Sequence, residues 1–296
     1  MKNLILTSIL MLFVVQATFA GDKQIARELK ARTLIVKQIS ENPKVVKKLE
    51  KDPSKLATYR KNIKESNALL KKNVQKHWKH HTSPLYKTAA EIEVMKAQEK
   101  EKKKKLRIAY TILSMDFFSE KHATREASAV KTNEHYTGDA LYLYLRFWDG
   151  VEIIYTSIPH VIPKDVDLVY AVRYLSNQVK GMEFDKNITD LCAENGPQVR
   201  TKTLLLTAFQ ISNLKKKDLL KVYPYPYKVV DQSVIDKAVL TSDPKYTVII
   251  SSDQSDTVVL KTMILTATGQ FAGYITSIKR TALSKKDLKQ LVKFCK

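Results

Sequence analysis

Glycine is missing from a stretch of more than one hundred residues, between Gly21 and Gly138, and six of the seven glycines lie at or beyond Gly138. The glycine-free stretch is rich in lysine, glutamate, alanine and leucine, which are strong helix formers. Glycine and proline mark turns, so a segment without glycine favours long helices that break only at its few prolines. The sequence therefore predicts two regions of different architecture, of which the first is helical.

Three prolines, Pro43, Pro53 and Pro84, divide the first region. They predict four helices, over residues 23–40, 44–51, 54–81 and 86–121. Apolar residues recur at helical spacing in the last two of these segments, which indicates that each helix buries one face. We therefore expect a basic helical arm over residues 21–121, folded as an antiparallel hairpin with Pro84 at the turn, and a linker over residues 122–138.

From residue 139 the pattern changes to alternating apolar and polar residues with many β-branched and aromatic side chains. Two hairpins are predicted, one around Asp149-Gly150 and one around Thr268-Gly269, because such pairs favour tight turns between strands. Further strands are expected over residues 201–211, 227–230 and 246–252. The expected fold class is α+β, with a mainly antiparallel sheet in a domain over residues 139–296.

Three segments of the second region resemble one another, since each follows a strand and places an aspartate near a helix start. They cover residues 163–168, 216–220 and 285–288. Their aspartates Asp165, Asp218 and Asp287 are 53 and 69 residues apart. An acid in the first turn of a helix is favoured by the helix dipole in any case. Because the spacing is not constant, we do not expect a solenoid, and an internal duplication is the less favoured interpretation.

The first 20 residues contain Lys2, an apolar run from Leu4 to Val15, and small residues at Thr18 and Ala20. This pattern is typical of a secretory signal peptide over residues 1–20. The run is shorter than the roughly 20 residues that span a bilayer. We therefore expect a secreted or periplasmic protein with no transmembrane segment after signal cleavage.

Two cysteines, Cys192 and Cys295, are present. In an oxidising compartment an even and low count favours one disulfide, so we expect a Cys192–Cys295 bridge. Two buried free thiols are the alternative. Neither cysteine has a C-x-x-C context, so redox catalysis is not expected.

Three histidines, His77, His80 and His81, fall within the five residues HWKHH. His77 and His81 are four residues apart, a spacing at which two histidines on one helical face can chelate zinc. No aspartate or glutamate lies between Glu65 and Glu91, however, while lysines surround the run. We expect neither a metal nor a cofactor here, and interpret the run as a basic helix end with Trp78 packed inward. A pH-responsive helix end stays open as an alternative.

Lysine supplies most of the excess positive charge, which is +21 over the chain. Residues 21–105 hold 24 Lys and Arg against 10 Asp and Glu, a net charge of 24 − 10 = +14. Lysine clusters attract phosphates, sulfates and anionic lipid headgroups, and therefore anionic surface polymers that carry such groups. The candidate contact residues are Lys71, Lys72, Lys76, Lys100, Lys102, Lys103, Lys104 and Lys105. A solvated face without a partner is the alternative.

The segment YPYPY alternates tyrosine and proline, which favours an extended backbone. Tyr223, Tyr225 and Tyr227 form a possible ligand surface, because exposed tyrosines stack on sugars and peptides. The alternative is that they lead into the strand over residues 227–230 and cover the sheet edge.

No common catalytic motif occurs, such as G-x-S-x-G, H-E-x-x-H or C-x-x-C. The sequence therefore favours a non-catalytic binding or structural protein of the cell exterior. Its expected partner is an anionic surface polymer or another exported protein, and not an intracellular nucleic acid. The alternative is an exported hydrolase with its site in residues 139–296, in a cleft that would gather His160, Asp165, Asp167, Asp185 and Asp190.

Overall fold

The computed structural model describes residues 23–81, 83–101, 110–117, 141–148, 152–160, 162–253, 258–278 and 282–296. These residues form helices and two five-stranded sheets, which confirms the α+β class. Both sheets are mixed, with two parallel and two antiparallel strand pairs in each, so the expected mainly antiparallel sheet is found only in part. Within the described residues, no helix is long and apolar enough to cross a membrane.

The first sheet has the strand order β2-β1-β3-β4-β5. Its strands are β1 (Thr33–Lys37), β2 (Leu85–Lys87), β3 (Tyr110–Phe117), β4 (Leu141–Phe147) and β5 (Glu152–Ile158). Strand β1 runs parallel to both β2 and β3, while β3–β4 and β4–β5 are antiparallel pairs. Strand β1 is buried on both faces of the sheet, as its β-branched sequence TLIVK favours.

The second sheet has the order β10-β9-β8-β6-β7. Its strands are β6 (Thr203–Leu206), β7 (Tyr227–Val229), β8 (Tyr246–Asp253), β9 (Val258–Leu265) and β10 (Phe271–Ile278). Strand β6 runs parallel to β7 and β8, and β8–β9 and β9–β10 are antiparallel. The β9–β10 hairpin confirms the predicted turn at Thr268-Gly269, where Gly269 has a φ of +71°. Glycine adopts this conformation at little cost.

The two sheets share one topology, so the chain contains two structural repeats. In each, the first strand in the chain, β1 or β6, lies second from one edge and is parallel to both of its neighbours, and the last two strands add to the other side in antiparallel pairs. The register also agrees, because Thr33 lies opposite Tyr110 in one sheet and Thr203 opposite Tyr246 in the other. Both strand pairs that end the sheets, β4–β5 and β9–β10, have a register shift. We call residues 23–183 repeat 1 and residues 188–296 repeat 2.

Helices connect and cover the sheets. Repeat 1 contains α2 (Lys23–Ala31), α3 (Pro43–Leu49), α4 (Pro53–His77), α5 (Ala89–Glu101) and α8 (Asp165–Glu183). Repeat 2 contains α9 (Ile188–Asn195), the short 3-10 helix η2 (Gly196–Thr201), α10 (Lys216–Val222), α11 (Gln232–Leu240) and α12 (Lys285–Phe294). In both repeats the last helix follows the last strand of the sheet.

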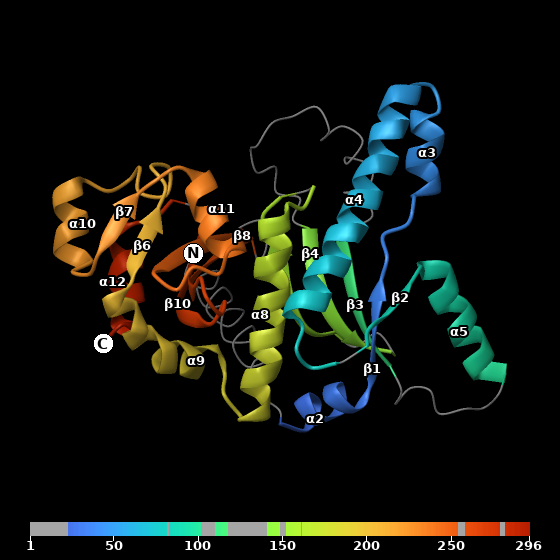
Figure 1. Cartoon of the computed structure of the whole chain (residues 1–296), viewed down its shortest axis with the longest axis horizontal. Helices are drawn as coiled ribbons and strands as arrows, with labels where there is room; N and C mark the ends of the chain where they lie inside the picture. Colours follow the sequence, from blue (N-terminus) through green and yellow to red (C-terminus); the bar gives the residue numbers. More distant parts are fainter. Residues whose placement is uncertain are drawn as a thin grey trace, which may run out of the picture.

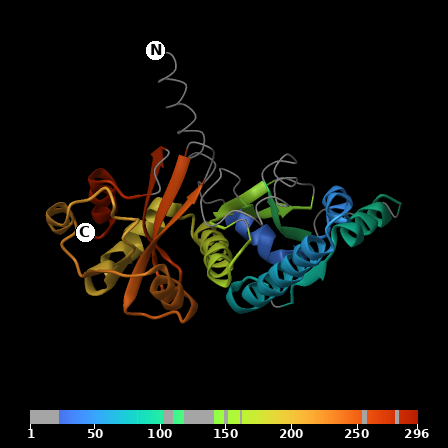
Figure 2. The ribbon, with the colours of Figure 1, turned by 90° about the horizontal axis from the view of Figure 1, so that it is seen from above.

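Helix α8, the last element of repeat 1, lies between the first sheet and repeat 2 (Figures 1 and 2). One hydrophobic cluster joins α8 to leucines of β4, such as Leu143, and to residues of repeat 2 such as Val248 and Phe271. Most of α8 is buried, including polar residues such as Arg173 and Gln178, because it is covered both by the first sheet and by repeat 2. Helix α12 follows the equivalent strand but exposes lysines on one face, so it covers the sheet of repeat 2 and leaves a polar surface.

Repeat 2 has a second hydrophobic cluster on the other face of its sheet. There α10 and α12 pack on residues such as Leu204, Ile249 and Met263. Helix α5 covers part of the sheet in repeat 1, where Ile92 packs on Ile35 and Trp148. Each sheet is therefore the middle layer between helices.

The long helical arm predicted over residues 21–121 is interrupted by strands. Residues 33–37 and 110–117 lie in strands, and Pro84 precedes strand β2 and not a second long helix. Sheet pairing decides this outcome, because β3 pairs with β4 across the expected linker. That linker, residues 122–138, lies outside the described residues, as does the predicted turn at Asp149-Gly150.

A smaller helical hairpin does occur between α3 and α4. Its cluster of Val45, Leu49 and Tyr59 is separate from the main core. Asn42 and Asp52 cap the two helix starts, and each helix has a proline in its first turn. The hairpin extends beyond the strands of the first sheet (Figure 1).

The two repeats explain the recurrent aspartates better than a fixed period does. Asp167 of α8 and Asp287 of α12 both occupy the third helical position, and each accepts a hydrogen bond from the backbone N–H of its N-cap residue, Lys164 or Ser284. Asp218 belongs to α10, which has a different place in the topology. The expectation that the chain lacks an internal repeat is therefore wrong at the level of structure. Unequal insertions hide the repeat, since α4 has 25 residues and α10 has seven.

Candidate functional site

The histidine run HWKHH lies where the C-terminal end of α4 meets α8. The helix ends at His77, and Trp78 is its C-cap residue with an extended backbone. His80 and His81 therefore follow the helix, so the helical face that we expected His77 and His81 to share does not extend to His81. Trp78 is buried, as predicted.

His77 forms part of a polar contact inside the protein. Arg173 of α8 donates from Nε to His77 Nδ1 at 3.3 Å and from its other nitrogens to Thr266 O and Ser242 Oγ. Burial, with the nearby charges of Arg173 and Lys76, lowers the pKa of His77 to about 4. His77 is therefore neutral at pH 7 and accepts a hydrogen bond.

His80 and His81 are also engaged. His81 Nδ1 accepts from Trp78 Nε1 at 2.8 Å, and His81 Nε2 donates to Leu29 O at 2.7 Å. His80 Nε2 donates to the carbonyl of Ser176, and its Nδ1 lies 3.4 Å from the carboxylate of Glu183. Burial lowers the pKa of both rings. Both nitrogens of His81 are occupied by the protein, which leaves none for a metal.

The described residues contain no group of three or more histidine, cysteine, aspartate or glutamate side chains that could hold a metal ion. His77 and His81 in particular contact different partners, Arg173 and Trp78.

The acidic residues named for a hydrolase lie at opposite ends of α8. Asp167 accepts from His160 Nδ1 at 2.8 Å, and Asp165 binds Lys72 and Asn73. Burial alone would raise the pKa of Asp165, but these two hydrogen bonds lower it below its usual value. Asp185 and Asp190 follow the other end of this 19-residue helix, which spans about 28 Å at 1.5 Å per residue. The five residues thus do not gather in one cleft.

The two cysteines are free thiols, so the predicted disulfide is wrong. Cys192 belongs to the cluster around α8, whereas Cys295 belongs to the cluster beneath α12. These clusters lie on opposite faces of the second sheet, and the sheet separates the thiols. Burial raises the pKa of both, that of Cys295 to about 11.

The tyrosines of YPYPY pack against repeat 2. Tyr223 is buried with 1% of its surface exposed, and Tyr225 contacts it edge-to-face at a centroid distance of 5.5 Å. Tyr225 and Tyr227 are half-buried and pack on the cluster beneath α12. The arrangement fits the alternative in which these tyrosines cover a sheet edge next to β7.

Helix α4 carries several lysines on the side opposite its buried face. We define the α4 lysine face as Lys61, Lys64, Lys71, Lys72 and Lys76, all of which are exposed. At 100° per residue these positions share one side of the helix, whereas Leu70, Val74 and His77 point the other way. Three of these lysines, Lys71, Lys72 and Lys76, were predicted from the sequence. Counting helical periodicity back from Lys71 would have added Lys64 and Lys61.

Among the described residues, few acidic side chains neutralise the positive charge of the α4 lysine face. Lys61 has Glu65 at 3.8 Å and Lys72 has Asp165 at 2.5 Å, while Lys71 lies over the ring of Tyr86. Lys64 and Lys76 form no ion pair within the described part of the chain. The side chain of Lys100 and residues Lys102 to Lys105 lie outside the described part.

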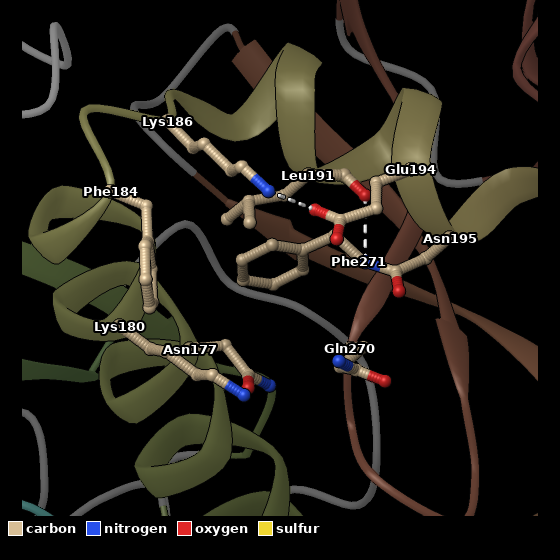
Figure 3. Close-up of a pocket in the computed structure, with 9 residues that line it drawn as sticks. All are labelled: Asn177, Lys180, Phe184, Lys186, Leu191, Glu194, Asn195, Gln270 and Phe271. Carbon is tan, nitrogen blue, oxygen red and sulfur yellow. Dashed lines mark hydrogen bonds and ion pairs between the residues drawn. The ribbon is translucent and has the colours of Figure 1, made fainter.

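A pocket of about 300 Å³ lies where the end of α8, helix α9 and the β9–β10 turn meet (Figure 3). It is lined by Asn177, Lys180, Phe184, Lys186, Leu191, Glu194, Asn195, Gln270 and Phe271. No motif predicted this pocket, because its residues come from three separate segments. The only sequence signal is Phe184, an aromatic residue among polar neighbours just after a helix.

Comparison with protein-family models, with curated proteins and with solved structures found no match for this chain.

Proposed function

We propose that this chain is a non-catalytic binding or structural protein of the cell exterior, and that its α4 lysine face contacts an anionic polymer. The observation that carries the proposal is the length of that face. Lys61 and Lys76 are 15 residues apart on one helix, which corresponds to about 22 Å at 1.5 Å per residue. A linear polyanion can therefore meet several ammonium groups at once.

The chemistry of lysine fits a polymer better than a single small anion. An ammonium group on a flexible stem acts as a mobile point charge, whereas arginine makes bidentate and geometrically specific contacts. Contacts of this kind give affinity without sequence readout, and they depend strongly on salt. The lysine pattern thus supports a surface contact with sulfated or phosphorylated polymers.

The position of the face also supports the proposal. Helix α4 packs on α8 through Leu70, Val74 and His77, so its lysine face points away from the core. The α3–α4 hairpin adds exposed lysines at the end of α3, Lys47 and Lys48. Signal-peptide cleavage after Ala20 would place this surface outside the cytoplasm, as we propose.

The proposal is tested by removing charge from this face and, separately, from another surface. The variant K64Q/K71Q/K76Q neutralises three lysines of the face. The matched control K237Q/K289Q/K293Q neutralises three exposed lysines of α11 and α12. Both variants lower the net charge by three, so they separate local contact from overall charge.

Binding is measured by fluorescence anisotropy with a labelled sulfated glycan at low salt. We expect K64Q/K71Q/K76Q to weaken binding by at least tenfold, because each lost contact with an anionic group reduces affinity. The control is expected to change binding less than threefold. Equal losses in both variants would attribute binding to net charge and contradict the proposed site.

A further inference from the structure

The pocket between α8, α9 and the β9–β10 turn combines an apolar floor with polar groups on one side. Phe271 is 1% exposed and forms, together with Leu191, the apolar floor of the pocket. Phe184, in contrast, is 61% exposed at the pocket rim. An exposed aromatic ring beside a pocket indicates a contact surface for an apolar group.

Several polar groups of the pocket are already used within the protein. Lys186 and Glu194 form an ion pair of 2.7 Å. Asn195 Nδ2 donates to Leu191 O, and its Oδ1 accepts from Gln198. These residues form one side of the pocket (Figure 3), and their hydrogen-bonding capacity is largely filled.

Three groups keep capacity for a ligand. Asn177 Nδ2 donates to Gly269 O at 2.9 Å, which leaves its Oδ1 as an acceptor. Gln270 Oε1 accepts from Thr268 Oγ1, which leaves its Nε2 as a donor. Lys180 is exposed and forms no ion pair among the described residues. Asn177 and Lys180 are three residues apart on α8, so both side chains lie on the same face.

The pocket thus offers a cation, a neutral donor and an acceptor beside an apolar floor. A peptide carboxyl terminus presents the complementary set, with a carboxylate, the N–H of the last residue and a side chain between them. We propose that this pocket binds the C-terminal residue of a peptide with an apolar side chain. The carboxylate accepts from Lys180 and Gln270 Nε2, and the terminal N–H donates to Asn177 Oδ1.

The remaining surfaces of the pocket receive the side chain of that residue. It packs against Leu191 and Phe271 and is covered by the ring of Phe184. The volume of about 300 Å³ lies at the lower end of ligand sites, which suits one residue and not a longer segment. This site is separate from the α4 lysine face, so either proposal can fail without the other.

The test uses the full chain and two probes, N-acetyl-Ala-Phe with a free carboxylate and the same dipeptide as its C-terminal amide. Binding is followed by isothermal calorimetry and by amide chemical shifts. We expect saturable binding of the acid, and at least tenfold weaker binding of the amide, because a hydrogen bond to a charged group is lost. The shifts are expected at Asn177, Leu191 and Gln270.

Two variants and a control variant test whether the peptide binds in this pocket. K180Q is expected to weaken the acid about tenfold and the amide little, whereas F184A weakens both. Both residues are exposed, so the fold should persist, and K289Q on α12 serves as the matched lysine control. Equal affinity for acid and amide, no effect of K180Q, or the absence of binding would each overturn the proposal.

Discussion

Arg173 of α8 donates a hydrogen bond to Nδ1 of His77, the last residue of α4, at 3.3 Å. The same guanidinium binds the carbonyl of Thr266 and the hydroxyl of Ser242 in repeat 2. One side chain thereby connects the end of α4 with two turns of the other repeat. Since Nδ1 must be unprotonated to accept from Arg173, the contact depends on a neutral histidine.

This dependence predicts that acid weakens the fold between pH 6.5 and about 4. Burial lowers the pKa of His77 from its usual 6.5 to about 4, and it also lowers the pKa values of His80 and His81. In this range the unfolded chain binds more protons than the folded protein. The free energy of unfolding should therefore fall with decreasing pH, by up to about 1.4 kcal/mol per pH unit for each histidine.

Urea denaturation at pH 7.5, 6.0 and 5.0 checks this expectation. The variant H77Q keeps an acceptor for Arg173 but cannot titrate, so its stability should depend less on pH than that of the wild type. A wild-type free energy of unfolding that stays constant from pH 7.5 to 5.0 would contradict the assignment of neutral, buried histidines.

Lys261 provides a second prediction, because it is fully buried in β9 and forms an ion pair of 2.7 Å with Asp287. Strand β9 of repeat 2 corresponds to strand β4 of repeat 1. When the β8–β9 pair is aligned with the β3–β4 pair, Lys261 takes the position that Leu143 has in β4. K261L would leave the carboxylate of Asp287 without its cation, at a cost of about 3 kcal/mol. Adding D287N removes the uncompensated charge, so the double variant K261L/D287N should be more stable than K261L.

Chemical denaturation of the three proteins measures these differences, with K289Q as a surface control that should not differ from the wild type. If K261L were as stable as the wild type, Lys261 would not be compensating a buried charge. The outcome also tests the equivalence of the two repeats, since leucine is the residue that repeat 1 uses at this position.

The thiols of Cys192 and Cys295 should be unreactive in the folded protein. Both side chains are fully buried, and burial raises the pKa of both thiols, that of Cys295 to about 11. We expect slow labelling by an alkylating reagent at pH 8 and the addition of two labels per chain after unfolding without reductant. An unfolded, unreduced chain that takes up no label would instead indicate a disulfide.

The α+β class and most strands of repeat 2 could be predicted from sequence, because alternation and turn residues such as Thr268-Gly269 are local signals. Strands β1 and β3 could not be recognised in this way. Short apolar runs fit a buried strand and a helix equally well, and the sequence TLIVK lies between helical segments. Pairing with distant strands decides the outcome.

The candidate sites differ in how much of each could be predicted from the sequence. A helical lysine face follows from spacing, so part of it was predicted. The contacts of His77 with Arg173, 96 residues away, and the pocket around Phe271 depend on how α8 packs between the repeats. The cysteine pair was mispredicted for the same reason, since an even count does not indicate on which face of a sheet each thiol lies.

The salt dependence of polyanion binding tests the proposed function most directly. A labelled single-stranded oligonucleotide serves as a calibrated polyanion, and its affinity is measured for the full chain and for K64Q/K71Q/K76Q over a salt series. Each lysine contact contributes about 0.7 to the slope of log affinity against log salt. We expect the slope of K64Q/K71Q/K76Q to be smaller by about 2, because three contacts are lost. An unchanged slope would show that the α4 lysine face does not contact the polymer.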